Sequence, residues 1–144
     1  MAFWLFKCNP RIYQLEARLA DPNPTITWTV TRYRDEIQAG DTVFLWATGA
    51  DRGIRAMFRV DAPPRPMAEL DSEQAYWKNG DTRQKWRVIG TLSHRDIHLS
   101  HTLLRQTSGL EGLSVFHGFQ QATNFRVTSA EGAILMRLIQ DEEK

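Results

Sequence analysis

Short hydrophobic runs separated by polar turns dominate the first two thirds of the chain and predict β-strands. Each run spans about six to eight residues, the usual length of a strand, and most are bounded by Gly, Pro, Asn or Asp. The predicted strands are residues 2–7, 42–47, 53–60 and 85–92, with a shorter extended segment around Ile97 and Leu99. The polar, glycine-bounded segment 48–53 between the second and third strands predicts a hairpin.

Helical spacing occurs in three places. Ile12, Leu15 and Leu19 recur at three and four residues, which predicts one amphipathic helix over residues 12–19. Residues 32–37 predict a second, short helix. Near the C-terminus, residues 128–131 read Thr-Ser-Ala-Glu, a capping box that predicts a helix continuing through Ile139.

The order of these elements predicts the fold class. The chain has 144 residues, near the modal size of one domain, so a single domain over residues 1–144 is expected. Strands and helices do not alternate as in a parallel α/β fold. The sequence therefore predicts an α+β domain built on a curled sheet or small barrel.

Composition narrows the class of protein. The formal charge is only +1, which excludes a polybasic binder and means that any nucleic-acid contact must come from a local patch. Cys8 is the one cysteine, which excludes a disulfide framework and a closed zinc site made of cysteines. The first apolar run is too short for a secretory signal or a membrane span, so we expect a cytoplasmic protein without membrane contact.

One stretch combines the side chains expected of a nucleic-acid surface. Residues 76–87 interleave three aromatic residues with four cations, although the segment just before them, residues 61–73, is acidic. Aromatic faces stack on bases while cations neutralise phosphates. Trp77 lies in the predicted loop, whereas Trp86 is explained as well by a place in the core as by a place on this surface.

Two other readings remain open. His94, His98 and His101 could meet as a metal site of a metal-assisted hydrolase if they lay on a helix. The alternation of Ile97 and Leu99 around His98 instead predicts an extended segment that sends the histidines to different sides. A protein-interaction module that grips its partner through the Trp77 loop is the other alternative.

Several motifs, taken in order, resemble the EVE domain. This family belongs to the PUA-like superfamily and is similar to the YTH readers of methylated adenine. The resemblance covers nearly the whole chain. Its motifs are residues 4–10, 26–33, 40–46, 51–56, 113–115 and 124–128.

The resemblance implies a curved β-barrel flanked by helices and a pocket that holds one flipped, modified base of DNA or RNA between aromatic rings. Trp28 matches a pocket wall, which we favour over its alternative, a plug at the end of the barrel. The backbone carbonyl of Thr29 matches an acceptor for an exocyclic amine. Asn9 matches a position that bonds a base edge, and Trp46 the cavity mouth. Tyr76 or Trp77 falls in the loop that supplies a second wall.

The implied function is a non-catalytic reader of a methylated or hydroxymethylated base, with no cofactor or metal. Its partner would be nucleic acid, and protein partners in a defence or modification system are also expected. Many relatives have Lys-Ser-Glu-Pro where this chain has Lys-Cys-Asn-Pro, so the resemblance does not carry over which modification is preferred. The cations expected to contact phosphates are Lys7, Arg52, Lys78, Arg83 and Lys85.

Overall fold

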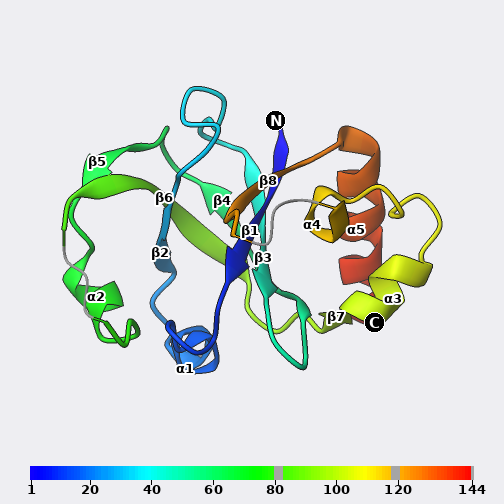
Figure 1. Cartoon of the computed structure of the whole chain (residues 1–144), viewed down its shortest axis with the longest axis horizontal. Helices are drawn as coiled ribbons and strands as arrows, with labels where there is room; N and C mark the ends of the chain where they lie inside the picture. The colour runs from blue at the N-terminus through cyan, green and yellow to red at the C-terminus, as the bar shows by residue number, and fades with distance from the viewer. Residues whose placement is uncertain (80–82, 118–120, 144) are drawn as a thin grey trace.

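The structure is a computed structural model that describes residues 1–79, 83–117 and 121–143. Within these residues, eight strands form one mixed sheet and five helices lie around it, an α+β fold (Figure 1). The strands are β1 (Phe3–Cys8), β2 (Thr25–Thr29), β3 (Thr42–Ala47), β4 (Gly53–Val60), β5 (Arg65–Met67), β6 (Lys85–His94), β7 (Leu99–Ser100) and β8 (Asn124–Val127). The helices are α1 (Leu15–Ala20), α2 (Asp71–Gln74), α3 (His101–Gln106), α4 (Ser114–His117) and α5 (Ser129–Glu142).

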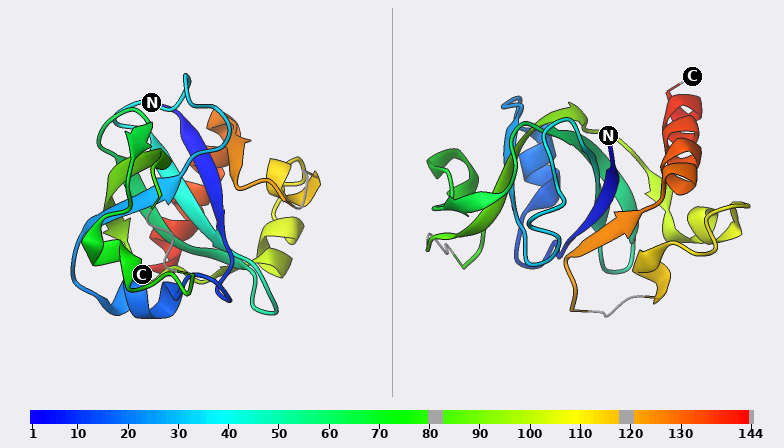
Figure 2. Two further views of the ribbon diagram at one scale, coloured as in Figure 1. Left: turned by 60° about the vertical axis from the view of Figure 1, so that its left-hand side comes forward. Right: turned by 90° about the horizontal axis from the view of Figure 1, so that it is seen from above.

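The sheet is strongly curled but is not a closed barrel. Figure 2 shows this curl from two sides. The strand order is β2-β6-β4-β3-β1-β8, with β5 and β7 added beside β6 and β4. β1 and β3 are parallel, and the predicted hairpin of β3 and β4 is confirmed as an antiparallel pair. In the described part of the chain no ladder joins the end strands β2 and β8. The predicted barrel is therefore not confirmed, because side chains instead of backbone pairs span the gap between these strands.

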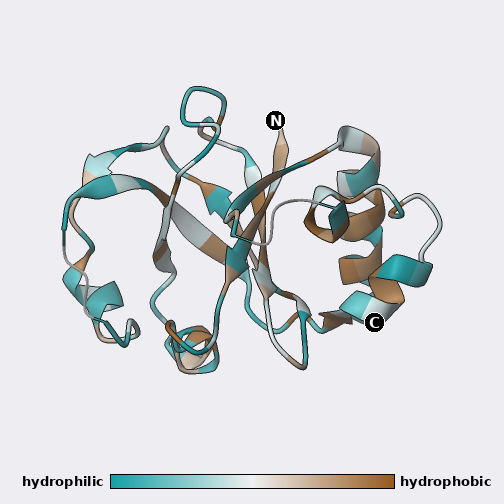
Figure 3. Cartoon of the chain, in the orientation of Figure 1, coloured by the Kyte–Doolittle hydropathy of each residue, from teal (hydrophilic) through white to brown (hydrophobic). Residues whose placement is uncertain are grey.

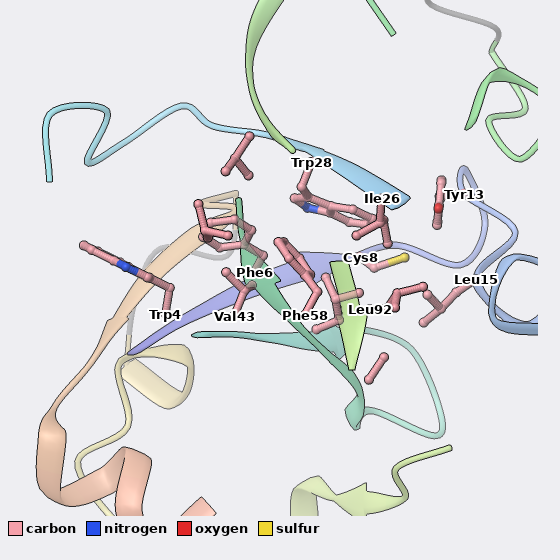
Figure 4. Close-up of a cluster of buried hydrophobic side chains, with 14 of the residues drawn as sticks. Trp4, Phe6, Cys8, Tyr13, Leu15, Ile26, Trp28, Val43, Phe58 and Leu92 are labelled. Atoms are coloured by element: carbon pink, nitrogen blue, oxygen red, sulfur yellow. The ribbon is translucent and has the colours of Figure 1, made fainter. Parts of the chain in front are cut away.

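The two faces of the sheet bury two separate cores, because successive side chains of a strand point to opposite faces. From β1, Trp4, Phe6 and Cys8 enter the first core and Leu5 enters the second. Figure 4 shows the first core, in which the Trp28 ring of β2 points inward toward Cys8.

The second core lies between the sheet and the helices α3, α4 and α5. Leu135 and Ile139 of α5 are buried there, and the predicted capping box is confirmed because Thr128 and Glu131 bond each other's backbone N–H groups. Hydrophilic residues gather on the outer turns of α2 and α3 (Figure 3). Among the described residues, no helix is both long and apolar enough to cross a membrane.

Two predicted helices differ from the structure. α1 begins at Leu15, later than expected, because residues 10–12 form a turn after Pro10. The helix predicted over residues 32–37 is wrong. Tyr33 there has a φ of 65°, in the left-handed region that interrupts a right-handed helix, and the segment forms turns instead.

Candidate functional site

A cavity of about 380 Å³ opens where the end of β1 meets the end of β2. This volume lies at the small end of the range for sites that hold small molecules. Its lining consists of Lys7, Cys8, Asn9, Ile12, Trp28, Thr29, Thr48, Trp77, Lys85, Gln121, Ala122 and Thr123. Segments far apart in the sequence therefore meet around one small space.

Two tryptophans from different elements supply the aromatic lining of this cavity. Trp28 comes from β2 and is only 2% exposed, while Trp77 is half-buried and follows α2. Their ring centroids are 6.0 Å apart with planes tilted by 45°. Tyr13 packs against both, at 5.1 Å from Trp28 and 4.6 Å from Trp77. Trp28 is thus a core residue and a cavity-lining residue at once.

The backbone carbonyl of Thr29 already has one partner. The Asn124 amide donates to it from Nδ2 at 3.2 Å. A carbonyl oxygen carries two lone pairs, so a second donor can still bond to it. The Thr29 carbonyl can therefore accept one further hydrogen bond.

Polar groups surround the aromatic lining. Asn9 is exposed, and its Oδ1 accepts a hydrogen bond from the Arg11 N–H at 3.0 Å. Lys7 lies with Nζ 5.4 Å from the Phe125 ring centroid, and partial burial lowers the pKa of its ammonium group. Lys85 also lines the cavity. The lining thus combines aromatic faces, hydrogen-bonding groups and cations.

A buried ionic layer lies behind the tryptophans, and sequence reasoning missed it. Glu69 and Arg87 pair at 3.3 Å, and Glu73 and Arg18 pair at 2.6 Å, with all four side chains almost fully buried. Nothing in the sequence indicated that Glu69 and Glu73 are buried, because both lie in a segment predicted to be an acidic loop. The only available signal was the presence of acidic and aromatic residues together in one long excursion between strands.

Trp46 and Tyr76 lie outside the cavity. Trp46 is buried in the second core, near the His101 and Phe116 rings. The Tyr76 hydroxyl donates to Asp21 at 2.6 Å, and its ring packs against the first core. Neither side chain is among those that line the cavity.

The predicted phosphate contacts divide between the cavity and other surfaces. Lys7 and Lys85 line the cavity, whereas Lys78 and Arg83 are exposed outside its lining. Part of the aromatic and basic stretch, residues 80–82, lies outside the described residues. Arg87, one of its four cations, is buried in the ion pair with Glu69.

Arg52 lines a second, larger hollow. This hollow has a volume of about 600 Å³ and lies between the β3–β4 loop and the β7–α3 junction. A bulge in β4 inserts Arg55 into its lining, and Arg55 pairs there with Glu16 at 2.6 Å. Thr48 lines the cavity and the next residue, Gly49, lines the hollow, so the β3–β4 loop contributes to both spaces.

The three histidines do not converge. His94 contacts Glu143 at 3.0 Å, His98 contacts Asp96 at 2.6 Å, and His101 packs beside the Trp46 ring. Burial, followed by the charges of Arg52 and Arg105, lowers the pKa of His101. Across the residues that the structure describes, no three His, Cys, Asp or Glu side chains are grouped so as to hold a metal ion.

Solved structures from several organisms share this fold at low sequence identity. A hypothetical protein from Leishmania major has a TM-score of 0.72 and 17% identity, covering 100% of this chain and 98% of its own. A Pseudomonas syringae protein has a TM-score of 0.65 and 20% identity, covering 95% and 99%. Human THYN1, solved in complex with DNA containing 5-methylcytosine, has a TM-score of 0.66 and 15% identity, covering 97% and 98%.

Comparison with curated proteins gave no match. The family model described as the EVE domain matches residues 2–138, nearly the full length of the chain. This match agrees with the resemblance carried by the motifs near β1, β2 and β3. The chain belongs to the EVE domain family.

Proposed function

We propose that this protein is a non-catalytic nucleic-acid-binding domain that holds one flipped, modified base in the cavity beside Trp28 and Trp77. The observation that carries the proposal is the convergence of candidate residues from separate elements on one space. Of the residues predicted to bind a base, Asn9, Trp28, Thr29 and Trp77 all line the cavity, and so do Lys7 and Lys85.

The chemistry of the lining suits a base better than a peptide or an ion. Leaving the helical stack costs a base a few kcal/mol, and stacking on an aromatic ring restores about 1 to 3 kcal/mol. Thr29 and Asn9 offer an acceptor and an amide to the base edge. Lys7 and Lys85 add positive charge where the phosphates on either side of the base would lie.

DNA containing 5-methylcytosine is the first ligand to test, since human THYN1 was solved with such DNA. Enclosing a methyl group contributes about 0.8 kcal/mol, or about fourfold in affinity. The methyl group alone therefore gives only modest discrimination. Any larger preference must come from polar groups such as Asn9 and Thr29 that reject the wrong base edge.

The strand that carries the flipped base would continue along the second hollow. The consecutive loop residues Thr48 and Gly49 line the cavity and this hollow respectively, and Arg52 lies in the lining of the hollow. A phosphate there would meet the positive charge of Arg52. This path extends the proposed interface beyond the base itself.

The experiment is a binding panel read by fluorescence anisotropy. Oligonucleotides of one sequence would carry cytosine, 5-methylcytosine, 5-hydroxymethylcytosine, adenine or N6-methyladenine, as DNA and RNA, in single and double strands. Trp77→Ala should weaken the best ligand by about 5- to 150-fold and reduce its advantage over the unmodified base.

Trp86→Ala is the matched control. Trp86 belongs to the same stretch but lines a different hollow, where the Arg34 guanidinium lies 4.8 Å from its ring. The Trp86→Ala variant should bind each oligonucleotide with the same affinity as the wild type. If the protein binds every oligonucleotide equally, or if Trp77→Ala binds the best ligand as tightly as the wild type, the proposal is contradicted. A protein partner that stays bound after nuclease treatment would favour the interaction-module alternative.

A further inference from the structure

Trp77 needs an anchor, because it lies in the long excursion between β5 and β6 and not on a central strand. Its backbone is attached to the residues around Tyr13. The Lys78 N–H donates to the Ile12 carbonyl at 2.9 Å, and the Gln14 N–H donates to the Tyr76 carbonyl at 2.8 Å. These bonds fix the position of the Trp77 backbone. They do not fix the direction of its ring.

Glu69 bonds the ring of Trp77 directly. The Trp77 indole donates from Nε1 to Glu69 Oε2 at 2.9 Å, and the Glu69 residue is 4% exposed. The other carboxylate oxygen, Oε1, accepts from the Leu70 N–H at 3.0 Å and from the Thr27 hydroxyl. Because the carboxylate is held from several sides, it is a fixed acceptor for the indole.

The same carboxylate is linked to the other side of the cavity. Nη1 of Arg87 lies 3.3 Å from Glu69 Oε2 and 3.4 Å from the Thr29 hydroxyl. Arg87 is itself held by the carbonyls of Met67 and Arg83. One buried ion pair therefore contacts both Trp77 and Thr29, which line the cavity from different elements.

We propose that Glu69 is a positioning residue for base binding: it sets the orientation of the Trp77 ring and, through Arg87, ties that ring to Thr29. The inference rests on the proposed function, because the ring's orientation matters to a ligand only if a base stacks there. Glu69 itself does not line the cavity.

If Glu69 had a purely structural role, its replacement would lower stability without a specific effect on the Trp77 ring. Glu73 is the matched comparison. It is also buried, pairs with Arg18 at 2.6 Å and accepts from the Tyr13 hydroxyl at 3.2 Å. The single N–H of the Trp77 indole donates to Glu69 instead. Replacing either glutamate removes a buried charge from an ion pair and should lower stability. Only replacement of Glu69 should alter the Trp77 ring.

The test compares Glu69→Gln with Glu73→Gln in the full-length protein. Affinity for an oligonucleotide containing 5-methylcytosine is measured beside the ¹H–¹⁵N signal of the Trp77 indole. In Glu69→Gln the indole signal should shift and exchange faster with water, and affinity should fall about tenfold. In Glu73→Gln the Trp77 indole signal should keep its chemical shift, and affinity should change by about twofold or less.

The outcomes separate this inference from the proposed function. Equal losses of affinity in the two folded variants, or a shifted indole signal with unchanged affinity, would overturn the positioning role. If Glu69→Gln does not fold, Trp77→Phe replaces it, since it keeps a ring but lacks the indole donor, and it should lose affinity to a similar extent. A wild type that binds no oligonucleotide counts against the proposed function, and an unmoved indole signal in Glu69→Gln counts against the positioning.

Discussion

The Asn124 side chain joins the two ends of the sheet by bonding to Thr29. Its Nδ2 donates to the Thr29 carbonyl at 3.2 Å, while its Oδ1 accepts from the Thr31 N–H at 2.8 Å. Asn124 is fully buried on β8, and Thr29 ends β2. One amide therefore satisfies backbone groups that a closed barrel would have paired by a ladder, and it does so at the edge of the cavity.

Asn124→Ala should destabilise the fold. The substitution leaves the Thr31 N–H and the Thr29 carbonyl without this partner, at a cost of about 1 to 3 kcal/mol in the free energy of unfolding. Urea denaturation of the variant and the wild type measures this loss of unfolding free energy. Arg126→Ala is the control on the same strand, because its side chain is exposed and its contacts with Glu36 and the Tyr33 ring should contribute less than the buried amide. Equal effects of the two substitutions would show that the bridge between β2 and β8 does not stabilise the sheet.

Trp28→Ala should lose more stability than Trp77→Ala. Trp28 is 2% exposed in the first core, so its truncation should cost about 3 to 5 kcal/mol, whereas Trp77 is only half-buried. Thermal melting of both variants checks the order. If Trp28→Ala melts like the wild type, Trp28 is not the core residue that its burial indicates.

Arg52→Ala should weaken long ligands selectively. A trinucleotide centred on the modified base would reach the cavity but not the second hollow, so its affinity should not change. For a longer single strand, the slope of log affinity against log salt should become shallower by about 0.7, the value for one lost phosphate contact. Arg137→Ala, which removes an exposed charge from α5, is the control. A loss that is equal for both ligand lengths would place Arg52 at the base instead.

Cys8 should be unreactive in the native protein. Burial raises the pKa of its thiol from 9.0 to about 12, so the nucleophilic thiolate is scarce at pH 8. Alkylation by iodoacetamide should proceed only after unfolding. Rapid labelling of the folded protein would show that the cavity exposes this sulfur.

The same thiol predicts a dependence of stability on pH. Between about pH 9 and pH 12 the unfolded chain loses the Cys8 proton while the folded chain retains it. The free energy of unfolding should therefore fall as pH rises, by at most about 1.4 kcal/mol per pH unit from this group. Comparison with Cys8→Ala isolates the contribution, because the stability difference between the two proteins should shrink over this range.

Local patterns predicted the long strands because each of them buries at least one face, but they did not predict β2 or the short, exposed β5. The runs that became β1, β3, β4 and β6 are recognisable from hydrophobicity alone, and the capping box marked the start of α5. The same patterns could not say which face enters which core. Trp46 illustrates this limit, because it alternates with Leu45 and so belongs to the second core, away from the cavity.

The remaining misses depend on contacts between distant residues. Tyr33 packs on the Trp4 ring at 5.2 Å, and the Arg126 guanidinium lies 4.6 Å from the Tyr33 ring, so tertiary contacts outweigh the local helical spacing. Glu69 and Glu73 are buried only because Arg87 and Arg18, from other elements, reach them. A single sequence carries no sign of those pairings. The cavity residues were found through family motifs, which encode such long-range proximity indirectly.

The pairing of β1 with β8 also has a consequence for how the protein is made. β1 leaves the ribosome before every other strand of the sheet, yet its antiparallel neighbour spans Asn124–Val127 (Figure 1). Until that segment emerges, one edge of β1 has exposed backbone donors and acceptors that can pair with another chain. A nascent or truncated chain that ends before Asn124 should therefore aggregate, and completion of the sheet must follow nearly complete synthesis of the domain.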